Sequence, residues 1–213
     1  MQDSMEVVKT GTTTLGMVCK DGVVLASERR ATAGTLIAHK STQKVFKLDD
    51  NIGLTTAGLV GDLQVLHRYL KAEVELYKLK RGSPMNVEAC ATLCANILSS
   101  RRYFPYWVHL IIGGTDAKGG HVFSLDAAGG CLPDKFTTSG SGSPYVFGVL
   151  EDHFKEGLTI SDGVDLAVRA VTAAMKRDAA SGDGLDVVTI TKAGYEKLSD
   201  EEIKRRKEKL NLT

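Results

Sequence analysis

The sequence predicts an α+β fold in which two antiparallel sheets pack face to face and helices cover both outer sides. Strand-like and helix-like segments come in blocks: strands, two helices, strands, two helices and a strand. Neighbouring strands are joined by residues typical of hairpin turns. The chain has 213 residues and no Pro-, Gly- or Ser-rich linker, so one domain can bury a substantial core.

The first block contains four predicted strands arranged as two hairpins. These strands cover residues 13–19, 23–27, 44–48 and 52–57. Asp21-Gly22 is the turn signal of the first hairpin, and Asp49-Asp50-Asn51 is that of the second. Four strands before any helix argue against an alternating strand–helix–strand order.

The remaining elements follow in the same blockwise order. Apolar residues at helical spacing predict helices over 62–81 and 87–102. Strands are then expected over 108–112, 121–125 and about 135–138, helices over 143–155 and 161–177, a strand over 185–191 and a charged helix over 200–210. Pro144 fits the first turn of its helix, and Ser161 is expected to cap the next one. Each sheet must bury a face and helices must cover the rest, which gives four layers.

Composition excludes several classes of partner. The formal net charge of +1 gives no electrostatic reason to bind nucleic acid or an anionic membrane. No apolar run approaches the roughly 20 residues that span a bilayer, and residues 1–11 lack the apolar core of a secretion signal. Cys90 and Cys94 lie one helical turn apart but lack a further ligand pair, so we expect no metal. Four thiols of this kind indicate a reducing, cytoplasmic location.

The step from Gly11 to Thr12 stands directly ahead of the first strand. Cleavage of this peptide bond would give Thr12 a free α-amine beside its hydroxyl, so one residue would hold both nucleophile and base. An α-amine titrates near pH ~7.7–8.0 and can accept a proton at neutral pH. The alternative is that Thr12 to Thr14 are ordinary strand residues, because threonine favours strands.

Five other segments carry groups that could assist such a nucleophile, and each has an ordinary explanation. Lys44 is either a surface lysine or a nearby positive charge, and residues 28–30 are either a charged strand end or a source of a carboxylate. Residues 139–144 and 178–184 are either connecting turns or sources of hydroxyl, amide and carboxylate groups. Residues 56–62 join a strand to a helix, and a glycine N–H there could face an oxyanion.

Taken together, these segments resemble the catalytic β subunits of the proteasome core particle, most closely the single-type archaeal kind. The matching segments are Gly-Thr-Thr-Thr-Leu-Gly (11–16), Asp-Gly-Val-Val-Leu-Ala-Ser-Glu-Arg-Arg (21–30), Thr-Ala-Gly-Leu-Val-Gly-Asp (56–62), Gly-Gly-Thr-Asp (113–116), Gly-Ser-Gly-Ser-Pro (140–144) and Arg-Asp-Ala-Ala-Ser-Gly-Asp-Gly (177–184). They come in the family's order over nearly the whole chain. The family belongs to the N-terminal nucleophile hydrolases, whose fold is a four-layer αββα sandwich.

The resemblance implies a threonine endopeptidase that processes itself between Gly11 and Thr12. Residues 1–11 would be a prosegment removed on maturation, and residues 12–213 a single catalytic domain. The implied catalytic residues are Thr12, Lys44, Glu28, Asp178, Ser141, Ser181 and Gly58. Thr12 would be the nucleophile, Lys44 the neighbouring cation and the Gly58 amide the oxyanion donor. Glu28 stands where the family more usually has Asp, which leaves its contact with Lys44 open.

The resemblance also implies a substrate pocket and partners. The implied pocket residues are Ala31, Thr42, Phe46, Thr56 and Val60. They predict a roomy, mostly apolar pocket and cleavage of unfolded polypeptide after large hydrophobic residues, the chymotrypsin-like preference. The implied assembly has four stacked seven-membered rings, α7β7β7α7, with a regulatory ATPase acting through the α rings. No metal or organic cofactor is implied.

Three alternatives remain open at this point. A non-catalytic ring subunit of the same fold would lack the Gly-Thr pair and the Lys44 equivalent. An N-terminal nucleophile amidase acting on a small molecule would work without ring assembly. A simpler two-ring bacterial protease fits less well, because residues 140–144 and 177–182 match the proteasome type.

Overall fold

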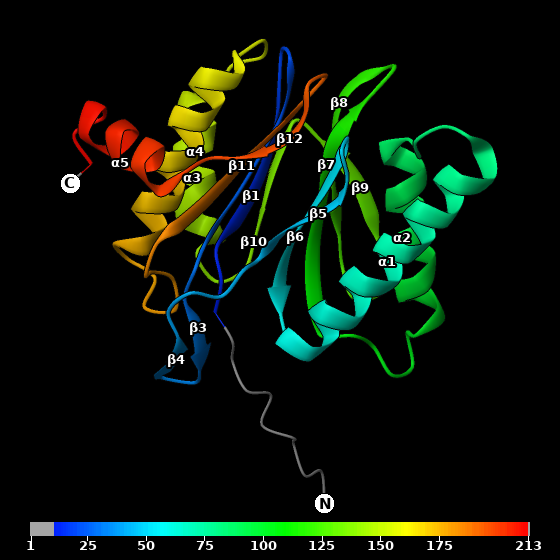
Figure 1. Cartoon of the computed structure of the whole chain (residues 1–213). Helices are drawn as coiled ribbons and strands as arrows, with labels where there is room; N and C mark the ends of the chain where they lie inside the picture. Colours follow the sequence, from blue (N-terminus) through cyan, green and yellow to red (C-terminus); the bar gives the residue numbers. More distant parts are fainter. Residues whose placement is uncertain (1–10, 213) are drawn as a thin grey trace, which may run out of the picture.

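The computed structural model describes residues 11–212 and has four layers, with two sheets in the middle and helices outside (Figure 1). The first sheet has the order β10 (Phe136–Ser139), β1 (Thr14–Cys19), β2 (Gly22–Glu28), β11 (Leu185–Thr191) and β12 (Gly194–Lys197). The second has the order β5 (Val45–Asp49), β6 (Ile52–Gly58), β7 (Val108–Asp116), β8 (Gly119–Leu125) and β9 (Cys131–Asp134). All neighbouring strands pair antiparallel. The predicted fold class is confirmed.

The helices divide between the two outer faces. The first sheet is covered by α3 (Ser143–His153) and α4 (Ile160–Met175), with α5 (Asp200–Lys209) beside them. The second sheet is covered by α1 (Val60–Arg81) and α2 (Val87–Ser100). Figure 1 shows these two helical layers on opposite sides of the paired sheets.

Three apolar clusters fill the spaces between the four layers. One lies between α1, α2 and the second sheet, and another between α3, α4, α5 and the first sheet. The third lies between the sheets. Strand β2 shows how the sequence serves both faces: Val23 and Leu25 point to the other sheet, whereas Val24 and Ala26 belong with the helices. Residues two apart in a strand share a face of the sheet. Because both faces are covered, β2 is buried along its whole length.

Short strands account for most of the difference from the sequence prediction. From residue 11 to the start of α1 the structure has six strands rather than four, because β3 (Ala31–Ala33) and β4 (Leu36–His39) form a separate hairpin. Strands β9 and β12 were also not predicted. Strand β4 is exposed throughout and so has no alternating pattern, and β9 contains Pro133 at the edge of its sheet. Proline is tolerated at a sheet edge but argues against a strand in the sequence.

The predicted cap of α4 is wrong by two residues. Thr159, rather than Ser161, is the N-cap residue, and its hydroxyl accepts a hydrogen bond from the Asp162 N–H at 3.2 Å. Ser161 already lies inside the first turn. Both residues suit the position chemically, but Thr159 has the extended backbone that a cap requires (φ −66°, ψ 159°).

Two predictions from composition concern membrane spans and metal sites. Within residues 11–212, no helix combines the length and the apolar character needed to cross a membrane. The same residues contain no group of three or more His, Cys, Asp or Glu side chains that could hold a metal ion. Residues 1–10, most of the predicted prosegment, lie outside the described residues, and so does Thr213.

Candidate active site

Four of the predicted site residues meet at one end of the paired sheets. Thr12 precedes β1, and Glu28 ends the antiparallel β2, so the register brings both to the same end of the strands in the first sheet. Lys44 precedes β5, and Gly58 ends the neighbouring β6, which places both at the corresponding end of the strands in the second sheet. Residues far apart in sequence therefore converge because of strand direction.

Lys44 and Glu28 form a buried ion pair that joins the two sheets. Their side chains are 4% and 0% exposed, and the Lys44 ammonium contacts Glu28 Oε1 directly. Burial lowers the pKa of Lys44 while Glu28 opposes that shift. Burial raises the pKa of Glu28, against the effects of Lys44 and two backbone amides. The longer glutamate side chain thus does reach Lys44, which settles the contact that the sequence left open.

The rest of the Glu28 carboxylate is also bonded. Oε1 accepts the Thr13 N–H at 3.1 Å, and Oε2 accepts those of Arg30 at 2.6 Å and Gly182 at 3.1 Å. Lys44 also donates to the Arg30 carbonyl. A buried charge is stable only when its bonding capacity is met, as it is here. The pair therefore holds an ammonium group rigidly beside the start of β1.

Thr12 connects to a second polar group, built on hydroxyls. Its backbone N–H donates to Ser141 Oγ at 3.2 Å, and its own hydroxyl donates to the Gly11 carbonyl at 2.7 Å. Ser141 and Ser181 both donate to Asp178 Oδ2 at 2.6 Å. A carboxylate that receives two hydroxyls can orient the one that faces the Thr12 nitrogen. Asp178 and Ser181 come from the segment after α4, and Ser141 from the turn before α3.

Two glycines allow the backbone to approach closely at this end. Gly58 has φ +131°, and a Cβ there would overlap the Trp107 carbonyl oxygen. Gly140 has φ +94°, and a Cβ there would overlap the carbonyl oxygen of Thr12. Both backbone conformations strongly favour glycine. Gly58 lines the same cavity as Thr12, where its amide could serve a developing negative charge.

A cavity of about 30 Å³ lies between Thr12 and the second sheet. Its lining residues are Gly11, Thr12, Ala31, Thr32, Thr42, Lys44, Thr56, Gly58, Val60 and Leu63. Four of the five predicted pocket residues are among them. Phe46 is not, and its ring instead packs against His67 at a centroid distance of 4.6 Å. The volume suits a water molecule but not a large side chain, so the expected roomy pocket is absent while Gly11 is attached to Thr12.

The structure adds residues to the site that the sequence did not single out. Thr32 and Leu63 line the cavity, and the hydroxyl of Thr13 lies 2.6 Å from Ser181 Oγ. Thr13 was expected to be a strand residue that shapes the cleft, not a member of the hydroxyl network. A hydroxyl directly before a strand carries no sequence signal of its own. The contact between Thr13 and Ser181 depends on the position of residues 178–184, which are distant in the sequence.

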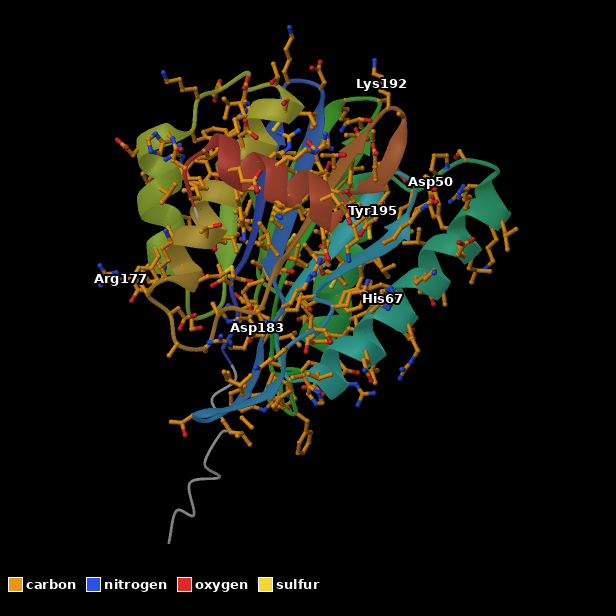
Figure 2. All side chains as sticks on the ribbon, turned by 60° about the vertical axis from the view of Figure 1, so that its left-hand side comes forward. Asp50, His67, Arg177, Asp183, Lys192 and Tyr195 are labelled. Atoms are coloured by element: carbon orange, nitrogen blue, oxygen red, sulfur yellow. The ribbon has the colours of Figure 1, made fainter. Side chains whose placement is uncertain are left out.

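A larger cavity in the described part of the chain lies elsewhere. It measures about 790 Å³ and is bordered by hairpin turns that include Asp50 and Lys192. Figure 2 shows these two residues at the opposite end of the sheets from Asp183, which marks the segment after α4. No buried ion pair or hydroxyl network faces the large cavity, whereas both meet at Thr12. Chemistry, rather than size, identifies the candidate site.

Comparisons with known proteins agree on one family. Residues 8–190 match the family described as "Proteasome subunit". The chain is 51% identical over 202 residues to "Proteasome subunit beta" of Methanothermobacter thermautotrophicus, covering 94% of this chain and 96% of the relative. It is 50% identical over 208 residues to the protein of that name from Thermoplasma acidophilum, covering 97% and 98%. The one from Methanothrix thermoacetophila is 53% identical over 194 residues, covering 91% and 94%.

Proposed function

Since the chain belongs to the proteasome subunit family, and its relatives are β subunits, we propose that it is a catalytic β subunit with Thr12 as nucleophile. Residues 1–11 would be the prosegment and residues 12–213 the mature domain. The observation that carries the proposal is the position of Thr12. It shares a cavity with Lys44 and Gly58, and its nitrogen is bonded to Ser141, which is bonded to Asp178.

Processing would begin at the Gly11–Thr12 bond. The Thr12 hydroxyl adds to the Gly11 carbonyl carbon, the C–N bond breaks, and the Thr12 nitrogen takes up a proton as an ester forms. Water then hydrolyses the ester and releases residues 1–11 with a carboxylate at Gly11. The hydroxyl already lies 2.7 Å from the Gly11 oxygen, which supports this assignment. Glycine before the bond has no side chain to hinder the approach.

Peptide cleavage would use the amine that processing releases. The amine accepts the hydroxyl proton of Thr12, directly or through a water, and the oxygen attacks a substrate carbonyl. The Lys44 ammonium would favour the threonine oxyanion electrostatically, and the Gly58 amide would stabilise the tetrahedral intermediate. The leaving amine departs with a proton, and water hydrolyses the acyl-enzyme. Until the Gly11–Thr12 bond is cut, the nitrogen is an amide and cannot act as the base.

The substrate would be unfolded polypeptide, cleaved after large hydrophobic residues. Val60 and Leu63 give the cavity its apolar wall, while Thr42 and Thr56 make it partly polar. Gly11 is part of the lining, so its removal would enlarge the cavity. Assembly with other proteasome subunits follows from the family, and we propose the α7β7β7α7 arrangement for it. All four cysteines are free, which supports a cytoplasmic location.

Substitution of Thr12 tests the proposal. In particles assembled with the α subunits, Thr12→Ala should form rings, retain residues 1–11 and cleave no peptide, because the hydroxyl is gone. Thr12→Ser is the matched control: it keeps a hydroxyl at the same place and should be processed and active. Mass spectrometry reports processing, and release of a fluorophore from a peptide reports turnover. Peptidase activity in Thr12→Ala would rule out Thr12 as the nucleophile.

A further inference from the structure

Arg30 follows β2 and contacts both parts of the candidate site through its main chain. Its N–H donates to Glu28 Oε2 at 2.6 Å, and its carbonyl accepts from the Lys44 ammonium. Almost any residue could make these two contacts, because they use backbone atoms only. They fix the position of Arg30 but do not explain why the side chain is a guanidinium.

The guanidinium of Arg30 reaches the segment of residues 178–184. Nε donates to Asp183 Oδ2 at 2.6 Å, and Nη1 donates to the Ala179 carbonyl at 2.8 Å. Between these two points the group lies so close to Gly182 that a Cβ there would overlap it. One planar side chain therefore touches three residues of the segment. A planar group with several fixed N–H donors is suited to such a multiple contact, whereas an ammonium group is not.

Residues 178–184 form neither a helix nor a strand. They connect α4 to β11, and Asp183 adopts a left-handed conformation with φ +61°. That conformation costs a non-glycine residue roughly 1–2 kcal/mol, although Asp tolerates it better than most. Hydrogen bonding to Arg30 holds the pKa of Asp183 below its usual value, so the pair stays ionised at neutral pH. The strained residue is thus also the one that the guanidinium binds.

The same segment supplies half of the hydroxyl network. Asp178 Oδ2 receives both Ser141 and Ser181, and Ser181 Oγ lies 2.6 Å from Thr13 Oγ1. The Gly182 N–H donates to Glu28. A shift of the segment would therefore change the groups around the Thr12 nitrogen and one bond of the Lys44–Glu28 pair together.

We propose that the Arg30 guanidinium is a positioning residue, which clamps residues 178–184 so that Asp178 and Ser181 stay aligned with Thr12. This inference rests on the proposed function. Arg30 does not contact the nucleophile. It acts through the segment, so its loss should impair the chemical step rather than substrate binding. Displacements of about 1 Å in a catalytic network can reduce rates by up to 10²-fold.

Arg30→Met, measured in the assembled particle, tests this role. Methionine keeps the length and apolar stem but removes all donors. We expect kcat to fall about tenfold or more with KM changed less than about twofold. The matched control is Arg29→Met, which also removes an arginine with two carboxylate partners, Asp186 and Asp200, neither of which lies in residues 178–184. The Arg29 stem lies close to Gly184, and methionine keeps an apolar side chain at that place. The kcat of Arg29→Met should stay within about twofold of the unsubstituted particle.

Two further variants separate a clamp from a general loss of structure. Arg30→Lys can still pair with Asp183 but cannot also reach Ala179, so its kcat should lie between those of the unsubstituted and Arg30→Met particles. Asp183→Asn should lower kcat severalfold, and adding it to Arg30→Met should cost nothing more, because the contact is already lost. Should Arg30→Met fail to assemble, Asp183→Asn alone decides: an unchanged kcat overturns the proposal.

The outcomes also distinguish the clamp from the proposed function. Equal kcat values for Arg29→Met and Arg30→Met, or a change confined to KM, would overturn the clamp while leaving Thr12 as nucleophile. An unsubstituted, assembled particle that neither loses residues 1–11 nor hydrolyses peptides would overturn the proposed function instead. Mass spectrometry and native gel electrophoresis of every variant show whether processing and assembly have taken place.

Discussion

At the scale of single residues, the Lys44–Glu28 pair combines a structural and a chemical role. It joins the ends of two sheets, and both side chains are nearly inaccessible to solvent. Removing one partner of a buried pair leaves the other uncompensated, which typically costs about 3–5 kcal/mol. Loss of activity in a single variant would therefore be ambiguous, because the fold itself would be weakened.

A pair of variants separates these roles. Lys44→Met should lower the stability of the unassembled chain by about 3–5 kcal/mol and abolish peptide hydrolysis. Adding Glu28→Gln removes the uncompensated charge and should restore much of the stability, because the amide oxygen can still accept backbone N–H groups. It should not restore hydrolysis, because the ammonium is still missing. Urea unfolding and peptide turnover measure the two effects, and a double variant with recovered turnover would contradict a chemical role for Lys44.

The site residues differ in how far the sequence could predict them. Thr12 and Lys44 stand next to strand ends, so the strand pattern and the resemblance together place them. Phe46 was assigned to the pocket, but its ring packs on His67 from α1, and no pattern within β5 reports the position of a helix. Thr13 and Arg30 were missed because their partners lie more than 140 residues away, in a segment without regular structure.

At the scale of elements, long segments with two buried faces were predictable and short exposed ones were not. Helix α4 and strand β2 have apolar residues at most of their buried positions. Strands β3 and β4 pair only with each other in the described part of the chain. Their pairing therefore depends on the turn at Gly34 and not on an apolar pattern. The boundaries of helices depend on backbone conformation, which explains why Ser161 was preferred over Thr159.

The cap of α4 can be tested by comparing these two residues. Thr159→Ala should lower the stability of the chain by about 1 kcal/mol, because the Asp162 N–H loses its acceptor at the start of the helix. Ser161→Ala is the matched control and should change stability by less than about 0.5 kcal/mol. Urea unfolding of the unassembled chain measures both. A larger loss for Ser161→Ala than for Thr159→Ala would return the cap to Ser161.

At the scale of the whole molecule, the distance between the two sheets is limited by glycine. Leu25 projects from β2 towards the second sheet, where it meets Gly53 of β6 and Gly113 of β7. A Cβ at Gly53 would lie 2.7 Å from Leu25 Cδ1 and 2.9 Å from Ile190 Cδ1. Glycine within a strand often marks such a close approach. The four layers were predictable from the block order, whereas this contact depends on the register between sheets.

The surroundings of two glycines predict opposite effects of an alanine substitution on stability. Gly53 does not have a positive φ, so Gly53→Ala keeps an allowed backbone and acts through overpacking alone, which costs about 1–3 kcal/mol. Gly148 lies in α3 with no atom within 4 Å of an added Cβ, so Gly148→Ala should stabilise the chain by about 0.8–1 kcal/mol through helix propensity.

Thermal unfolding of the unassembled chain measures both substitutions without the influence of neighbouring subunits. The sheets carry Thr12 and Glu28 on one side and Lys44 and Gly58 on the other, so a wider gap at Leu25 would also separate the two parts of the site. Processing at Gly11 should therefore slow in Gly53→Ala and stay unchanged in Gly148→Ala. If Gly53→Ala proves as stable as the unsubstituted chain and is processed at the same rate, the close approach of the sheets does not depend on glycine at this position.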